Sequence, residues 1–208
     1  MRALLTAALI LTLAGCATGA KSDRAARRAA EASSWQASVT DADRKRLREW
    51  RSDFAAALQK ARAAGHAAEI YAEGSLLVPD AALPGALPNG TYRCRTIKLG
   101  AQGPGLLDYV AYPAFTCQVI QYGSVQYFAK LDGSQRPRGK IYPADAMRGV
   151  FLGMLMLGDE TRPMRYGSDP ERSLAGWVER VGERRWRIVF PAPHFESLTD
   201  VMELIPAP

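Results

Sequence analysis

The chain has 208 residues, of which 48% are hydrophobic and 23% are charged, and its formal net charge is +6. This composition is that of an ordinary globular protein, and the chain is long enough for one domain with a sizeable core. The basic balance would suggest nucleic acid as a partner in a cytoplasmic protein, but the first residues argue against that class.

The N-terminal residues are typical of a bacterial lipoprotein signal. Arg2 precedes an apolar run over residues 3–13, which is shorter than the roughly 20 residues needed to span a bilayer. Leu13-Ala14-Gly15-Cys16 resembles the lipobox, and this resemblance implies cleavage after Gly15 and acylation of Cys16 with palmitate. Ala17 matches the outer-membrane sorting pattern. The alternative is an ordinary signal peptide with a free cysteine nearby.

These residues predict a signal peptide over 1–15, a tether over 16–39 and a single domain over 40–208. A lipid anchor at the periplasmic side of the outer membrane removes nucleic acid as a partner. The basic charge then either faces lipid phosphates and other acidic envelope components, or only keeps the surface solvated. The tether could likewise touch anionic headgroups or be a solvated leash.

The two remaining cysteines form an even pair in an oxidising compartment. With Cys16 acylated, Cys94 and Cys117 are expected to form a disulfide bond, since disulfides persist outside the cytoplasm. The alternative is two buried free thiols.

One amphipathic helix is predicted over residues 41–64. Thr40 can cap it, Gly65 can end it, and apolar residues recur at steps of three and four between them. The apolar face could lie on a membrane surface, but packing against its own domain is favoured. A second short helix is predicted over residues 66–72.

After Gly90 the apolar residues alternate, which predicts strands. Turn residues separate the segments and place the clearest hairpin at Gly182-Glu183. We expect Met147–Leu157 to be buried on both faces because it is almost wholly apolar, with Gly149 and Gly153 at bends or close contacts. The strands are expected over residues 91–99, 109–112 with 115–122, 125–131, 139–142, 147–157, 174–181, 185–191 and 201–205.

About eight strands with short connections predict a mainly β (α+β) fold. Its centre would be an antiparallel, closed or nearly closed barrel with the amphipathic helix packed on it. An open α+β sheet with one helical layer is the alternative.

The sequence contains no convincing set of catalytic residues. We therefore predict that the protein is not an enzyme and binds no cofactor and no metal. The acids Asp159 and Glu160 follow a strand and show no spacing that singles them out for glycosidase chemistry. His194, Glu196 and Asp200 could approach a metal, but zinc sites need three or four ligands, and no cysteine or second nearby histidine completes the set.

The most distinctive polar stretch is Gly133–Lys140, which we interpret as a turn. Its candidate binding residues for an anion or partner are Ser134, Gln135, Arg136, Arg138 and Lys140. Arginine side chains can bind an anionic group with two parallel hydrogen bonds, and loops on a rigid barrel commonly carry binding residues. The alternative is a solvated hairpin loop.

A second basic cluster lies on the last hairpin, with Trp177 and Trp186 between its arginines. We expect both tryptophans to pack in the barrel and not to act as stacking platforms.

Several motifs together resemble a bacterial family known as domain of unknown function 4893. They are Thr91–Arg95 with Ile97–Gly100, Gly133–Pro137, Phe151–Gly153, Leu157–Glu160 and Val178–Arg187. The resemblance covers most of the chain from the helix onward and implies no activity and no catalytic residue.

Three functions remain open. The first is a non-enzymatic envelope lipoprotein whose barrel binds a ligand or partner. The second is an inhibitor of a lysozyme-like or proteolytic enzyme, with Gly133–Lys140 as the inserting loop. The third is an envelope hydrolase, for which the sequence offers no convincing residue set.

Overall fold

The computed structural model describes residue 24 and residues 34–208. The predicted signal peptide, the acylation of Cys16 and most of the predicted tether lie outside these residues. Among the residues that are described, no helix is long and apolar enough to span a membrane.

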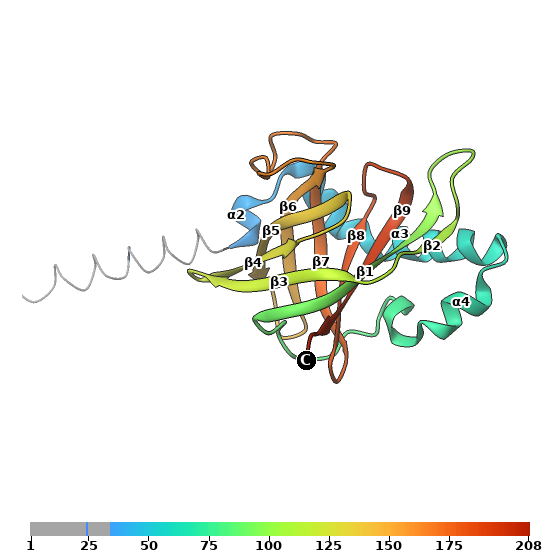
Figure 1. Ribbon diagram of the computed structural model, residues 1–208, viewed down its shortest axis with the longest axis horizontal. Helices are drawn as coiled ribbons and strands as arrows, with labels where there is room; N and C mark the ends of the chain where they lie inside the picture. The colour runs from blue at the N-terminus through green and yellow to red at the C-terminus, as the bar shows by residue number, and fades with distance from the viewer. Residues whose placement is uncertain (1–23, 25–33) are drawn as a thin grey trace, which may run out of the picture. The chain divides into compact units, whose positions relative to one another are not determined.

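The β-strands close into an antiparallel barrel (Figure 1). Eight strands pair in chain order, and the ring is completed by β1 with β9, from Tyr92 opposite Pro206 to Ala101 opposite Ser197. The short β2 pairs only with residues 97–99 of β1 and lies outside the ring. The strands are β1 (Gly90–Ala101), β2 (Tyr109–Ala111), β3 (Phe115–Tyr122), β4 (Val125–Lys130), β5 (Gln135–Pro143), β6 (Arg148–Leu157), β7 (Ser173–Gly182), β8 (Arg185–Pro191) and β9 (Ser197–Pro206). The predicted closed barrel is confirmed, and the open sheet is excluded.

Side chains fill the middle of the barrel. Phe151 makes edge-to-face contacts with Phe128 and Phe190, with ring centroids 5.8 and 5.4 Å apart. Room for these rings comes from Gly153, where an added Cβ atom would lie 2.3 Å from the carbonyl oxygen of Arg138 on the neighbouring strand. The predicted close packing at Gly153 therefore occurs, and the barrel centre is a packed core.

The predicted disulfide between Cys94 and Cys117 is present in this core. Cys94 lies opposite Phe115, so Cys117 is two residues from direct register with it, and the two Cα atoms are 5.9 Å apart. Both side chains point into the barrel, and the bond joins β1 to β3.

The long helix α3 (Asp41–Ala63) covers one side of the barrel and runs behind β1, β8 and β9 in Figure 1. The hydroxyl of Thr40 accepts a hydrogen bond from the backbone N–H of Asp43 at 3.1 Å, as expected for a cap. The apolar face, centred on Trp50 and Phe54, packs against outward-facing residues of these strands. This face is therefore buried on the barrel itself, as we predicted.

The short helices α4 (Ala67–Ala72) and η1 (Gly74–Leu77) continue this outer layer. A buried ion pair fastens it: Arg187, 0% exposed, donates to Glu179, 1% exposed, at 2.6 and 2.8 Å. The same guanidinium donates to the carbonyl oxygens of Leu76 and Pro79, both at 2.7 Å. Part of the predicted basic cluster is thus a structural link between layers.

Helix α2 (Trp35–Ser38) falls within the segment that we expected to be a tether. Trp35 packs edge-on against Trp177, with ring centroids 6.1 Å apart, and Val39 is buried. The packed domain therefore includes residues 34–39.

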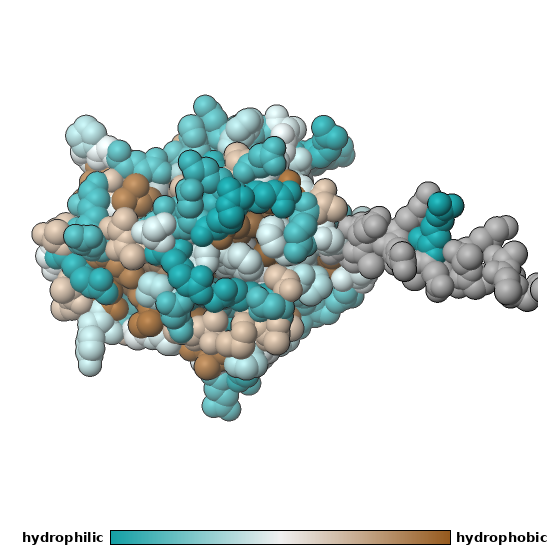
Figure 2. Space-filling model, turned by 180° about the vertical axis from the view of Figure 1, so that it is seen from behind, coloured by the Kyte–Doolittle hydropathy of each residue, from teal (hydrophilic) through white to brown (hydrophobic). Residues whose placement is uncertain are grey.

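The surface opposite the view of Figure 1 is mostly hydrophilic, with hydrophobic residues in separate small groups (Figure 2). This agrees with an exposed face of α3 that carries Lys45, Arg48, Glu49 and Arg51.

Candidate functional site

One end of the barrel holds a pocket of about 430 Å³, which we call the mouth pocket. Its floor is formed by inward-facing residues, among them Ile141, Val178 and Trp186. The β3–β4 and β5–β6 turns form its rim. Barrel mouths of this kind are common places for small ligands, and the volume is within the usual range of about 300–1,000 Å³.

A segment over residues 79–89, which we call the strap, crosses this end between η1 and β1 (Figure 1). Its residues Gly85, Ala86 and Leu87 line the mouth pocket. Two backbone bonds hold the strap to the barrel, one from the N–H of Leu83 to the carbonyl oxygen of Arg180 at 2.8 Å and one from the N–H of Gly85 to that of Ala146 at 3.4 Å. A side-chain bond from Gln126 to the carbonyl oxygen of Leu87, also 2.8 Å, holds its other end.

Among the residues that line the mouth pocket, Trp186 has a buried polar side-chain atom without a partner in the described part of the chain. This side chain is 6% exposed, and its indole N–H is buried without an acceptor among the described residues. Buried donors are nearly always paired, so an unpaired one beside a cavity indicates a ligand or an ordered water.

The two charged residues that line the mouth pocket already have partners. Arg148 is 2.8 Å from Glu179, and its guanidinium lies 5.3 Å from the ring centroid of Trp50, which is within cation–π range. Asp145 accepts a hydrogen bond from the backbone N–H of Met147 at 2.7 Å. The pocket is therefore suited to a neutral, mainly apolar ligand with a hydrogen-bond acceptor.

The opposite end of the barrel, which we call the closed end, has only about 30 Å³ of free volume. Lys98 points inward there and lies 3.0 Å from Asp200 and 3.2 Å from Glu196. Burial raises the pKa of Asp200 against the opposing effect of Lys98. Burial would lower the pKa of Lys98, but the two carboxylates hold it above its ordinary value.

The closed end also contains the residues considered above for a metal. Glu196 and Asp200 contact Lys98, whereas His194 is 3.7 Å from Glu171. Across residues 34–208 no cluster of three or more histidine, cysteine, aspartate or glutamate side chains could hold a metal ion. The two acids are paired with one internal ammonium group, that of Lys98.

The acids considered for glycosidase chemistry have structural contacts. Glu160 pairs with Arg172 and accepts the backbone N–H of Leu157 at 2.9 Å. Asp159 lies in the same turn, after β6.

The prediction of a loop over Gly133–Lys140 was wrong, because β5 begins at Gln135. Pairing of β5 with β6 extends from Gln135 opposite Leu157 to Pro143 opposite Gly149. Inward positions on β5 are taken by Gln135, Pro137 and Gly139, so the strand lacks the apolar alternation on which the prediction depended.

The five candidate residues of that stretch are consequently separated. Ser134 is exposed in the turn, and Gln135 faces inward, 3.4 Å from Glu196. Arg136 closes two loops by donating to the carbonyl oxygens of Gly133 at 2.7 Å and Glu160 at 2.8 Å. Arg138 and Lys140 lie on the outer face of the barrel.

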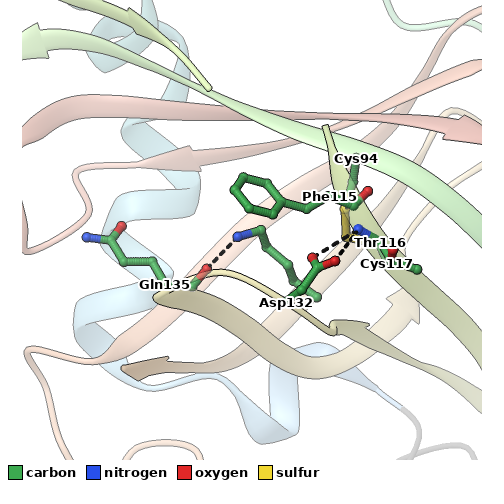
Figure 3. The surroundings of a disulfide bond; sticks show 7 residues. Cys94, Phe115, Thr116, Cys117, Asp132 and Gln135 are labelled. Carbon is green, nitrogen blue, oxygen red and sulfur yellow. Dashed lines mark hydrogen bonds between the residues drawn. A yellow bond between two sulfur atoms is a disulfide. The ribbon is translucent and has the colours of Figure 1, made fainter. Parts of the chain in front are cut away.

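A buried lysine that the sequence did not single out lies near the disulfide. Lys130 is 4% exposed and donates to the carbonyl oxygen of Gln135 at 2.9 Å. Burial lowers the pKa of Lys130 to about 8. Figure 3 shows the surroundings, with Asp132 accepting the backbone N–H of Thr116 beside the bonded Cys94 and Cys117. The sequence could have indicated this buried residue, because Lys130 occupies an inward position in the alternating pattern of its strand.

The comparisons with known proteins give one match. The model of a family described as a domain of unknown function, DUF4893, matches residues 35–204, which confirms the resemblance noted in the sequence. The chain matches no curated protein and no solved structure.

Proposed function

Because the chain belongs to the DUF4893 family, which carries no assigned activity, we propose from the site itself that it is a bacterial envelope lipoprotein that binds a small ligand in the mouth pocket. The ligand is neutral and mainly apolar and bears one hydrogen-bond acceptor. The protein acts as a binding module and not as an enzyme.

The unpaired indole N–H of Trp186 beside a pocket of about 430 Å³ carries this proposal. An apolar pocket with few fixed polar groups binds through buried area and uses its polar groups for orientation. The lipobox-like Leu13-Ala14-Gly15-Cys16 supports the envelope location, and the disulfide in the core is consistent with an oxidising compartment.

The inhibitor alternative depended on an inserting loop at Gly133–Lys140. Since residues 135–140 are paired within β5, that stretch cannot enter a cleft as a loop, and we do not propose this function.

The test uses the dye prodan, which is neutral and apolar and has a carbonyl acceptor. We expect saturable binding with a blue shift of its emission. Ala146→Trp places an indole at the pocket rim and should weaken binding at least tenfold. The matched control is Ala55→Trp, on the exposed face of α3, which should bind as the unchanged chain does.

Two results would overturn the proposal. One is the absence of saturable binding. The other is equal weakening by Ala146→Trp and Ala55→Trp, which would place the dye elsewhere. A separate measurement addresses location: incorporation of labelled palmitate should occur in the unchanged chain and be lost in Cys16→Ser.

A further inference from the structure

A second pocket lies on the outer wall of the barrel, over β4, β5 and β6, and has a volume of about 310 Å³. We call it the outer pocket. It is separate from the mouth pocket, because it is lined by Arg138 and Lys140, which alternate outward along β5. The segment Pro163–Tyr166 forms its other wall.

Three cationic side chains line the outer pocket: Arg138, Lys140 and Arg165. None of them has a carboxylate within 4.0 Å among the residues that the structure describes, whereas Arg95, Arg148, Arg185 and Arg187 on other strands are each paired with a glutamate. Asp43, which accepts a hydrogen bond from Tyr166 in the pocket wall, is itself paired with Arg46 at 2.8 Å. The pocket therefore has an uncompensated positive charge.

Arg138 adds an independent observation. Its Nε–H is buried, with no acceptor among the described residues. Leaving a charged donor desolvated and unpaired is costly, so the arrangement is typical of a site that an anion completes. A guanidinium can offer Nε–H and Nη–H as a fork to two oxygens of one anion.

The remaining lining is aromatic and apolar. Tyr127, Tyr142 and Tyr166 come from β4, β5 and the loop after β6, and Met154 lies between them. The loop wall is fixed, because the hydroxyl of Tyr166 donates to Asp43 at 2.6 Å. Such walls suit an apolar or aromatic group attached to the anion.

We propose that the outer pocket binds a phosphate monoester, with the phosphate on Arg138, Lys140 and Arg165 and the ester group against the tyrosines. A dianion matches three cations better than a carboxylate does, and its oxygens suit the arginine fork. The phosphate could belong to a soluble molecule or to a lipid headgroup.

The first test is a titration of the ¹⁵N-labelled chain with phenyl phosphate at low ionic strength, followed by NMR. We expect saturable shifts at Gly139, Gly153 and residues 164–166, together with a shift of the Nε–H signal of Arg138. Arg138→Gln should weaken binding about tenfold, as expected for loss of a charge-assisted pair. Lys140→Gln and Arg165→Gln, at exposed positions, should each weaken it a few-fold.

Two variants make the result specific. Arg138→Lys keeps the charge and loses the planar fork, so binding should weaken several-fold while the fold is retained. Arg48→Gln removes the same charge from the exposed face of α3 and should leave affinity unchanged. If Arg138→Gln does not fold, Arg138→Lys and Lys140→Gln still decide the question.

The second test distinguishes the two sources of phosphate. Binding of phenyl phosphate without recruitment to vesicles that contain phosphatidic acid, whose headgroup is itself a phosphate monoester, supports a soluble ligand. Recruitment to those vesicles, but not to phosphatidylcholine vesicles, that falls with Arg138→Gln and not with Arg48→Gln supports a headgroup. The proposal is overturned if phenyl phosphate gives no saturable shifts, or if Arg48→Gln weakens binding as much as Arg138→Gln. Because prodan reports the mouth pocket, either proposal can fail alone.

Discussion

The two ends of the barrel are built from the same strands but differ in how their polar groups are satisfied. At the closed end, Lys98 pairs with both Asp200 and Glu196, and about 30 Å³ of free volume is left. At the mouth, a strap covers about 430 Å³, and the indole N–H of Trp186 has no acceptor among the described residues. The chain itself therefore pairs the buried polar groups at the closed end, whereas at the mouth the buried donor of Trp186 lacks an acceptor within residues 34–208.

We expect the largest loss of stability when the lysine at the closed end is removed. Lys98→Met would leave two acids without their cation and should lower the free energy of unfolding by roughly 3–5 kcal/mol. Urea unfolding measures this loss. The double variant Lys98→Met with Asp200→Leu should recover most of it, and a loss below about 1 kcal/mol in the single variant would show that the cluster is not a stabilising unit.

Removal of the disulfide in the middle of the barrel should also destabilise the fold, but by less than Lys98→Met does. Replacing Cys94 and Cys117 by alanine should lower the free energy of unfolding by roughly 3 kcal/mol, because the open loop regains conformational freedom in the unfolded chain. Reductant should shift the unfolding midpoint of the unchanged chain and leave that of the variant in place. An unchanged midpoint in the unchanged chain would contradict this account.

Lys130 differs from Lys98, because it is buried without a carboxylate partner among the residues that the structure describes. Burial lowers the pKa of Lys130 to about 8 in the folded chain, while in the unfolded chain it stays near the ordinary lysine value of about 10.4. Between these values the unfolded state binds more protons, so stability should rise as pH increases from about 8 toward 10. Unfolding of the unchanged chain and of Lys130→Met should be compared across this range. A constant difference between them would show that burial does not lower this pKa.

The smallest effect is expected at the mouth. Trp186→Phe should change the free energy of unfolding by less than about 1 kcal/mol, because the lost packing is offset by removal of a buried donor without an acceptor. The same variant should weaken prodan binding a few-fold. Ala55→Trp is the control for both measurements, and a large loss of stability with unchanged dye affinity would assign Trp186 to packing alone.

Local patterns were enough to predict much of the fold. Alternation predicted most strands, Thr40 predicted the start of α3, and the even cysteine pair predicted the disulfide. The start of β5 was missed because proline and glycine, here Pro137 and Gly139, are typical of turns. In the barrel both residues face inward, where their small size leaves room for other core side chains. The closing pair of β1 with β9 was not predictable from local patterns, because these two strands are far apart along the chain.

The sites were harder to predict for the same reason. The mouth pocket combines the strap at Gly85–Leu87 with Trp186, about half the chain away, and neither segment indicates a cavity by itself. Trp186 was correctly expected to pack in the barrel, but whether its N–H finds an acceptor depends on every neighbour. Arg138 and Lys140 were selected for their charge, and they share the outer face of β5 with Arg136, which differs from them because backbone carbonyl oxygens of two loops occupy its guanidinium.

The most direct test of the central claim is the NMR signal of the Trp186 indole N–H, assigned by its loss in Trp186→Phe. We predict that prodan moves this signal downfield, because a new hydrogen bond forms. The amide signals of Thr96 and Lys98 at the closed end should not shift. A signal that does not move while prodan binds, or shifts centred on the closed end, would contradict a ligand site at the mouth of the barrel.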